Sequence, residues 1–297
     1  MTSENFSKLN RSIKMSGFLN ILKDKSEKRY HNFAIEEISS INRITEEAYL
    51  ENPTWLGGDK EFVCLFIDLD NSSILSFKKH AVTMAKIYDY VTQNIVDTLN
   101  FAPCKANYID IKGDGAFGIY EGEKAIFKAL CAAVTFKTFF DKHIRIKFPI
   151  NEQQGFLAKN HKTINCKMAI EQGKILVKKI GKRGDNNEVW AGRLINNASK
   201  LASLSKKIYQ TDIELFTEQQ SLLIVSENVY KKLSSKSQYT ITSCGHDFCG
   251  QETKIRADLW KSYSISANED VYGNIVYYMA SRWCNKCGDT YMEEILK

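Results

Sequence analysis

An apolar run that ends abruptly in acidic and hydroxyl residues is the feature that most constrains this sequence. Residues 62–67 are all hydrophobic and rich in strand-forming types, which predicts a central strand buried on both faces. Asp68 follows directly, and a polar turn, residues 70–73, comes next. A carboxylate held rigidly at the end of a buried strand is well placed to hold a metal ion, provided that a second carboxylate meets it.

A candidate for that second carboxylate lies in a predicted hairpin. Two strand-like runs within residues 106–120 flank Gly113-Asp114-Gly115, which is a strong signal for a tight turn. Helical spacing of apolar residues predicts one helix before this hairpin and one after it, over 76–99 and 125–140. Residues 165–177 then resemble a second hairpin-like unit.

The resulting order, β-α-β-β-α-β, predicts an α+β fold. It is the ferredoxin-like arrangement, in which helices cover an antiparallel sheet. The first strand and the following hairpin are neighbours in such a sheet, so Asp68 and Asp114 are expected side by side. Two carboxylates that face one point suit Mg²⁺ or Mn²⁺. The alternative is structural: Asp68 caps a strand end, and Asp114 is an ordinary turn residue.

Three segments are expected along the chain. Residues 1–58 form a helical lead-in, with one helix near Phe18–Leu22 and another over 33–41. Residues 59–235 form the main domain, and residues 236–297 form a small cysteine-rich segment. Within the main domain the remaining expectations are loops over 141–162 and 181–187, a helix over 189–204, a strand over 221–225, and a short helix capped by Ser226.

Composition narrows the class of protein. The chain has 297 residues, of which 43% are hydrophobic, so it can bury a sizeable core. Its net charge is +6, and the basic residues are scattered, which does not indicate nucleic-acid binding. No apolar run approaches the roughly 18 to 20 residues that span a bilayer, and the first 14 residues lack an apolar signal core. We therefore expect a soluble, cytoplasmic protein.

Four motifs resemble those of the class III nucleotidyl cyclases, in the same order. The first is Phe66-Ile-Asp68-Leu-Asp-Asn-Ser-Ser73, and the second is Lys112-Gly-Asp114-Gly. The other two are Lys167-Met-Ala-Ile-Glu-Gln-Gly173 and Gly192-Arg-Leu-Ile-Asn196-Asn-Ala-Ser-Lys200-Leu. The resemblance covers about residues 60 to 235.

The resemblance implies a head-to-tail homodimer with composite active sites. Two Mg²⁺ or Mn²⁺ ions would be held by Asp68, Asp114 and the backbone carbonyl of Leu69. The substrate phosphates would lie against Asn71, Ser72, Ser73 and Lys167, of which the first three lead into a helix N-terminus. Asn196 of the partner subunit would orient the ribose. Lys200 stands where the family usually has an arginine, so it keeps the charge but loses the planar fork.

The base pocket departs from the pattern of adenylate cyclases. Where those enzymes carry a lysine, this chain has Asp110, which can only accept hydrogen bonds from a base. A divergent pocket in a compact cyclase is similar to the Pycsar antiphage enzymes. This resemblance implies a pyrimidine cyclase, with UTP favoured over CTP, whose cyclic product switches on a separate effector. Two alternatives remain: an adenylate or guanylate cyclase, and a catalytically silent nucleotide-binding sensor.

The C-terminal cysteines form two pairs. Cys244 and Cys249 are one pair, with His246 between them, and Cys284 and Cys287 are the other. Paired cysteines separated by tens of residues are typical of a structural zinc ribbon, in which His246 could replace one thiolate. Free thiols and a redox pair are the alternatives. The segment could also be a sensor appended to the cyclase domain, or a nucleic-acid-binding ribbon, which the scattered charge disfavours.

Overall fold

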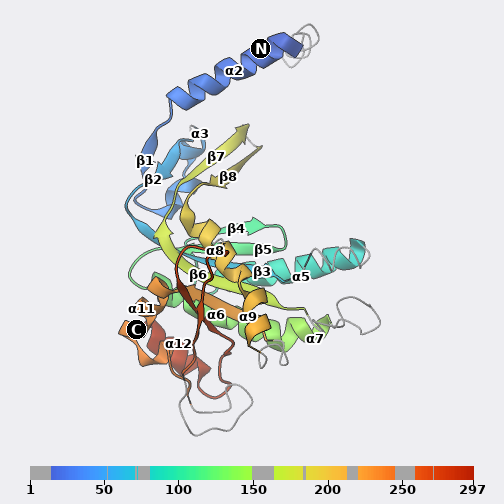
Figure 1. Ribbon diagram of the computed structural model, residues 1–297, viewed down its shortest axis with the longest axis vertical. Coiled ribbons are helices and arrows are strands. Elements are labelled where there is room, and N and C mark those ends of the chain that lie inside the picture. Colours follow the sequence, from blue (N-terminus) through green and yellow to red (C-terminus); the bar gives the residue numbers. More distant parts are fainter. Residues whose placement is uncertain are drawn as a thin grey trace.

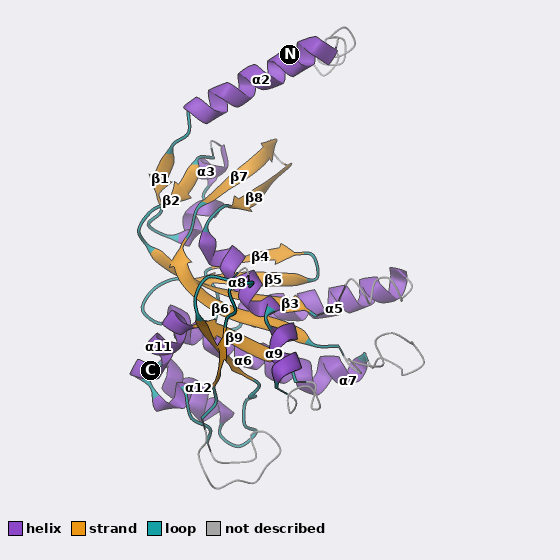
Figure 2. Ribbon diagram, viewed as in Figure 1, coloured by secondary structure: helices purple, strands orange, loops and turns teal. Residues whose placement is uncertain are grey.

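The computed structural model contains one large and one small β-sheet with helices packed on both faces of the large one (Figures 1 and 2). The structure describes residues 15–51, 53–70, 72, 81–148, 164–182, 185–212, 220–244, 258–269 and 271–297. The large sheet has seven strands in the order β10-β11-β9-β6-β3-β5-β4. These strands are β3 Glu61–Leu69, β4 Tyr108–Lys112, β5 Gly115–Tyr120, β6 Cys166–Lys174, β9 Leu222–Ser226, β10 Lys261–Ser264 and β11 Ile275–Met279.

The centre of this sheet has the predicted ferredoxin-like arrangement. In chain order the elements are β3, α5 (Ala81–Leu99), β4, β5, α6 (Ala125–Phe139) and β6. The four strands lie in the order β6-β3-β5-β4, and each neighbouring pair is antiparallel. The α+β class and the β-α-β-β-α-β order are therefore confirmed.

The central strand is buried on both faces, as its composition predicts. Its odd-numbered residues, among them Leu65 and Ile67, pack with α5 and α6. Its even-numbered residues, such as Phe66, pack with α8 (Arg193–Ser203) and α9 (Ser205–Thr211) on the other face. Because side chains alternate along a strand, Asp68 lies on the face that α8 covers.

The small sheet was not predicted. It has the order β1-β2-β7-β8 and consists of β1 Ile35–Glu37, β2 Trp55–Gly57, β7 Val177–Lys182 and β8 Asp185–Trp190. The expected lead-in is helical in α2 (Met15–His31), η1 (Ile41–Thr45) and α3 (Glu47–Glu51), but the helix expected over 33–41 is wrong because β1 lies there. A strand of three residues is too short to show an alternating pattern. Figure 1 shows α2 projecting away from the rest of the molecule.

Two expectations between residues 165 and 190 are also wrong. Residues 165–177 do not form a hairpin: β6 runs unbroken to Lys174, and the chain then enters the small sheet. The expected charged loop over 181–187 is the tip of the β7–β8 hairpin. In the strands of this hairpin, Lys179 and Glu188 form a cross-strand ion pair, with Nζ and Oε1 2.9 Å apart. Helix α8 therefore begins at Arg193 rather than at Val189.

The expected loop after α6 begins as helix. Residues Phe140–Ile144 form a π-helix (η2), and Arg145–Lys147 form α7. The fully buried Lys137 donates to Asp141 one turn later, with Nζ and Oδ2 2.7 Å apart. This ion pair favours continuing the helix past residue 140. Residues 149–163 lie outside the described part of the chain.

The C-terminal segment continues the same core. Strand β11 pairs with β9, and β10 pairs with β11, so both extend the large sheet. Helix α12 (Gly288–Leu296) packs on α6, and α11 (Glu227–Lys236) and η4 (Gln238–Thr240) connect the two parts. The expected zinc ribbon is thus not a separate body in the described residues. Ser226 stands at the N-cap of α11, but its hydroxyl makes no capping hydrogen bond and donates to Glu171 instead.

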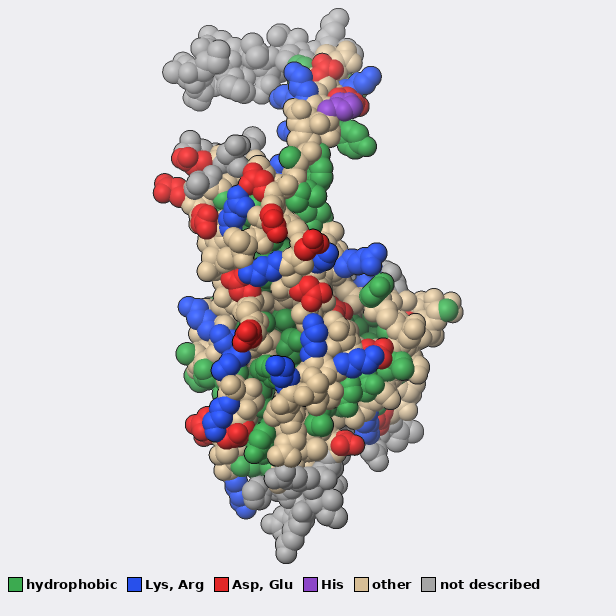
Figure 3. Space-filling view, turned by 90° about the vertical axis from the view of Figure 1, so that its left-hand side faces the viewer, with side chains coloured by type: hydrophobic (Ala, Val, Ile, Leu, Met, Phe, Trp, Pro, Cys, Tyr) green, Lys and Arg blue, Asp and Glu red, His purple; other side chains and the backbone are tan. Residues whose placement is uncertain are grey.

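The surface charge is mixed. On the face drawn in Figure 3, basic and acidic side chains are interspersed, without a block of one sign. Among the described residues, no helix is both long and apolar enough to cross a membrane.

Candidate active site

Asp68 lies at the end of β3, opposite Lys167 on β6. The two side chains form an ion pair, with Oδ2 and Nζ 2.9 Å apart, and both are largely buried. Burial raises the pKa of Asp68, and the ion pair with Lys167 opposes that rise. The negative charge of Asp114 raises the pKa of Asp68 further, so the two carboxylates lie within electrostatic range of each other.

Asp114 lies in the turn between β4 and β5, beside the end of β3. Its Oδ2 atom is buried and has no hydrogen-bond partner in the described part of the chain. The next residue, Gly115, lies directly against Asp68: a Cβ there would be 2.5 Å from the carbonyl oxygen of Ile67 and 2.7 Å from Oδ1 of Asp68. The structure therefore brings together the two acids that the sequence pairs. A buried carboxylate oxygen without a partner suits a divalent cation, which prefers oxygen ligands.

The segment after β3 contains a third acid that the sequence analysis missed. Asp70 is only 2% exposed, and neither carboxylate oxygen has a hydrogen-bond partner among the described residues; Nζ of Lys206 lies 3.8 Å from Oδ1. The available signal was its position two residues after Asp68. Of the other predicted residues, Leu69 is the buried last residue of β3 and Ser72 is half-buried, whereas Asn71 and Ser73 lie outside the described residues.

Asp110 does not face solvent. It lies opposite Phe117 on the sheet face that also carries Phe66, and its side chain is 11% exposed. Its Oδ2 accepts a hydrogen bond from Nε1 of Trp190 at 3.0 Å. The same oxygen forms an ion pair with Lys112, whose Nζ lies 2.8 Å away. These contacts hold the carboxylate in place on the same face as Asp68.

Asn196 and Lys200 lie one turn apart on the exposed face of α8. With Arg193 they line a cavity of about 390 Å³. Nδ2 of Asn196 donates to the carbonyl oxygen of Gly192 at 3.1 Å. Among its described residues, the structure records no hydrogen bond from Asn196 to Asp68 or Asp114. The neighbouring Asn197 is buried and faces the sheet.

Three of the four C-terminal cysteines lie together. The sulfur atoms of Cys244, Cys284 and Cys287 are all within 4.8 Å of one another. The backbone N–H of Lys286 donates to Sγ of Cys284 at 3.4 Å. Burial raises the pKa of Cys284, but the N–H groups of Lys286 and Cys287 outweigh it and lower the pKa. Three clustered sulfurs are a donor set that suits zinc. Cys249 and His246 lie outside the described residues.

Comparisons with known proteins agree with this arrangement. No family model matches the chain. It is 28% identical over 275 residues to a uridylate cyclase of Propioniciclava tarda, covering 92% of this chain and 77% of that protein. It is also 28% identical over 242 residues to a uridylate cyclase of Micromonospora echinofusca, covering 80% and 70%.

Two solved structures share the fold. A bacterial light-regulated adenylyl cyclase aligns with a TM-score of 0.50 at 11% identity, over 97% of this chain and 73% of that chain. The catalytic core of a rhodopsin-guanylyl cyclase with converted specificity aligns with a TM-score of 0.50 at 11% identity, over 78% and 99%. The chain is therefore similar in sequence to proteins named uridylate cyclase, and it shares the fold of an adenylyl and a guanylyl cyclase.

Proposed function

We propose that this protein converts a pyrimidine nucleoside triphosphate to its 3′,5′-cyclic monophosphate and pyrophosphate, with UTP favoured and CTP next. The observation that carries the proposal is the meeting of Asp68 and Asp114 at one strand end, with a buried oxygen of Asp114 left unpaired. The relatives named uridylate cyclase support the choice of reaction.

The proposed roles follow from where each group lies. Asp68, Asp114 and the carbonyl of Leu69 would hold two Mg²⁺ or Mn²⁺ ions. Such ions, when bound, lower the pKa of the ribose 3′-hydroxyl and neutralise the triphosphate. Lys167, already paired with Asp68, would balance charge on the phosphates, and Asn71, Ser72 and Ser73 would contact them. The 3′-oxygen then attacks the α-phosphorus, and the bond to the departing pyrophosphate breaks.

The exposed residues of α8 would complete the site of a second subunit. Asn196 and Lys200 point away from the sheet of their own chain, so a head-to-tail homodimer would carry them to the partner's carboxylates. Asn196 would orient the ribose by hydrogen bonds, and Lys200 would balance charge that develops on the phosphates.

Asp110 supports a base other than adenine. Its Oδ2 is occupied by Trp190 and Lys112, which leaves Oδ1 to accept from a base. The N3–H of uracil and the N4 amino group of cytosine are suitable donors, and so are the N1–H and N2 amino groups of guanine. Adenine N1 is an acceptor and would face a carboxylate without a proton between them, which disfavours ATP.

The cellular role follows the resemblance. We propose that the cyclic nucleotide acts in antiphage defence through a separate effector, and that residues 59–235 form the catalytic unit. Residues 236–297 would be a sensor-like unit stabilised by zinc on Cys244, Cys284 and Cys287, with Cys249 or His246 as the fourth ligand. Metal analysis of freshly purified protein tests this part: less than about one zinc per chain would overturn it.

The reaction is tested by incubating the protein with Mn²⁺ and each of the four labelled nucleoside triphosphates. Cyclic UMP is the expected main product, and the Asp114→Ala variant should form none while keeping its fold. No cyclic product from any nucleotide would overturn the enzyme proposal and favour the catalytically silent sensor. The presence of Lys200 in place of the usual arginine would agree with that alternative. A dominant cyclic AMP or cyclic GMP product would overturn the pyrimidine preference.

A further inference from the structure

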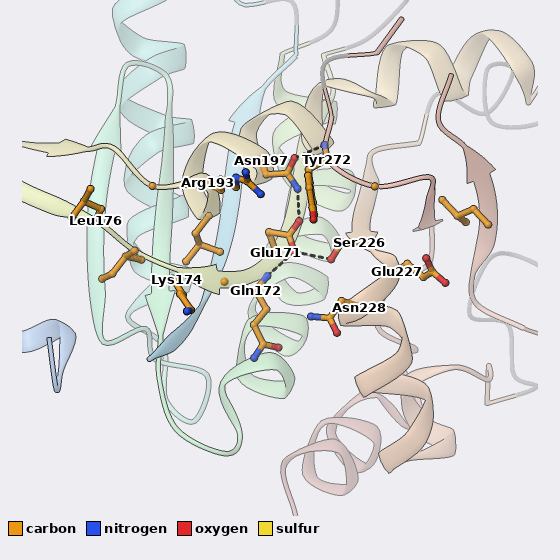
Figure 4. A pocket seen from close by; sticks show the side chains of 16 residues that line it. Glu171, Gln172, Lys174, Leu176, Arg193, Asn197, Ser226, Glu227, Asn228 and Tyr272 are labelled. Carbon is orange, nitrogen blue, oxygen red and sulfur yellow. Dashed lines mark hydrogen bonds between the residues drawn. The ribbon is translucent and has the colours of Figure 1, made fainter. Parts of the chain in front are cut away.

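A second cavity, of about 490 Å³, lies against the first residues of α8 (Figure 4). We call it the α8–α11 cavity. Its wall comes from the end of β6, the start of α8, the start of α11 and the residues just before β11. In the β3–β6 register, Glu171 of this wall lies opposite Cys64, and Lys167 lies opposite Asp68. Four residues of strand therefore separate the two acids, which places them about 13 Å apart along the sheet. The apolar part of the wall is formed by Ile175, Leu176, Leu194 and Ile275.

Glu171 is a buried carboxylate that the proposed reaction does not use. It is 7% exposed, and burial raises its pKa. Its Oε1 accepts hydrogen bonds from Oγ of Ser226 at 2.7 Å and from the backbone N–H of Gln172 at 2.8 Å. Its Oε2 accepts one, from Nδ2 of Asn197, and so retains acceptor capacity (Figure 4). A buried titratable group in a cavity with apolar walls is a mark of a ligand site.

The start of α11 offers the complementary group. The hydroxyl of Ser226 donates its hydrogen bond to Glu171, and α11 has no side-chain cap hydrogen bond. The first N–H groups of a helix have no partner within the helix, and Glu227 and Asn228 place that first turn in the cavity wall. An acceptor atom of a ligand can bond there, next to a donor that faces Glu171.

An exposed aromatic ring completes the wall. Tyr272 is 71% exposed, and the guanidinium carbon of Arg193 lies 5.1 Å from the centre of its ring. Its backbone N–H donates to Oδ1 of Asn197 at 3.0 Å, which fixes this part of the chain against α8. A large exposed ring fixed by its backbone is suited to stack on a flat ligand.

We propose that the α8–α11 cavity binds a planar heterocycle that carries an N–H donor beside a carbonyl acceptor. The donor faces Oε2 of Glu171, the carbonyl faces the first turn of α11, and the ring lies between Tyr272 and the apolar wall. The cavity volume falls within the range of about 300–1,000 Å³ that is usual for small-molecule sites.

The ligand would act on α8. Arg193, Asn197 and Tyr272 line both this cavity and the neighbouring one that contains Asn196 and Lys200. Asn197 is bonded to Glu171 on one side and to Tyr272 on the other, and Asn196 is the next residue. Occupancy therefore restrains the helix that carries Asn196 and Lys200. The binding of a ligand and the restraint of α8 do not depend on the proposed function, but an effect of the ligand on turnover does.

Binding is tested with 2-quinolone, a bicyclic lactam, and its N-methyl analogue, which lacks the donor. In ligand-observed NMR on the full chain, 2-quinolone should bind, and the N-methyl analogue should bind about tenfold more weakly. Gly173→Val adds a side chain to the cavity wall where a Cβ meets no atom within 4 Å, and should weaken binding by a similar factor. Ser235→Trp, on the exposed face of α11 outside the cavity, should bind as the wild type does.

The outcomes separate the site from the reaction. No binding of 2-quinolone, or equal binding by Gly173→Val, would overturn the ligand site whatever the turnover. Hydrogen exchange of residues 193–203 should slow when 2-quinolone is added, and unchanged exchange would overturn the effect on α8. The rate of cyclic nucleotide formation should change with 2-quinolone in the wild type and in Ser235→Trp but not in Gly173→Val. A protein that binds and shows slower exchange but never cyclises any nucleotide refutes the proposed function alone.

Discussion

At the scale of single residues, Gly115 keeps the two acids of the proposed metal site together. Any side chain at this position would meet the carbonyl of Ile67 and the carboxylate of Asp68. We expect Gly115→Ala to destabilise the protein by about 1–3 kcal/mol, because it overpacks a closed site. Displacing Asp68 should also lower cyclase turnover by about 10²-fold.

Thermal denaturation and the nucleotide assay measure these two effects. Gly173→Ala is the matched control for stability, since its new Cβ meets no atom within 4 Å. Full turnover by Gly115→Ala would mean that the position of Asp68 does not matter to the reaction.

Glu171 should give stability a distinctive pH dependence. Burial raises its pKa in the folded protein above the value in the unfolded chain. The folded state therefore holds this proton more tightly, so the contribution is fully present below the unfolded pKa and is lost as pH rises through the folded pKa. The free energy of unfolding of the wild type, minus that of Glu171→Gln, should fall as pH rises from about 4.5 to 8. Urea unfolding at several pH values measures it, and a difference that is constant or rises with pH would contradict the expectation.

The acidic residues discussed above differ in how readily their positions in the fold can be predicted from the sequence. Asp68 and Asp114 could be predicted because each stands beside an unmistakable strand or turn signal. Asp70 was hidden in a polar run, where burial cannot be inferred. Glu171 interrupts an apolar strand, which was a usable signal, but its partners Ser226 and Asn197 are 55 and 26 residues away and only the fold brings them together.

At the scale of elements, length decided what could be predicted. The strands β3 and β9 are continuous apolar runs, and the helices α5 and α6 have apolar residues at helical spacing over enough residues to be recognised. The strands β1 and β2 have three residues each, and the β7–β8 hairpin is rich in charged and polar residues and has no continuous apolar run. The pairing of β1 with β2 and of β2 with β7 is a long-range choice that local patterns do not encode.

The helical extension after α6 depends on the buried pair of Lys137 and Asp141. Their side chains are 0% and 2% exposed, and Asp141 also binds Arg145 with Oδ1 and Nη2 2.5 Å apart. Asp141→Asn would leave Lys137 as an uncompensated buried charge, which should cost about 3–5 kcal/mol. Urea unfolding tests this cost.

An exposed pair with the same spacing is the control. Lys231 and Glu227 are also one turn apart, with side chains 69% and 40% exposed. Lys231→Gln should therefore change the free energy of unfolding by less than about 1 kcal/mol. Equal effects of the two substitutions would show that burial does not decide the strength of the Lys137–Asp141 pair.

At the scale of the whole molecule, the C-terminal segment and the catalytic fold share one sheet. Strands β10 and β11 extend it, and Tyr272, just before β11, is bonded to Asn197 on α8. A displacement of the C-terminal segment would therefore act directly on α8, the helix that carries Asn196 and Lys200, through the Tyr272–Asn197 hydrogen bond. The sulfur atoms of Cys244, Cys284 and Cys287 lie within 4.8 Å of one another, so two parts of this segment that are distant in sequence meet there.

The proposed head-to-tail dimer makes the active site a property of two chains, and complementation tests that directly. Asp114→Ala and Asn196→Ala should each be inactive alone. In a heterodimer of the two, one site receives intact acids from one chain and an intact asparagine from the other. Random pairing at equal amounts should restore about a quarter of the wild-type turnover, since half of the dimers are mixed and each has one good site in two.

The matched control mixes Asp114→Ala with Asp68→Ala. Both substitutions damage the acidic half of the site, so every heterodimer has two broken sites and should stay inactive. Recovery in the control as well would mean that the acids act across the interface, contrary to their contact within one chain. No recovery in the first mixture, with dimers present by light scattering, would mean that Asn196 serves the acids of its own chain.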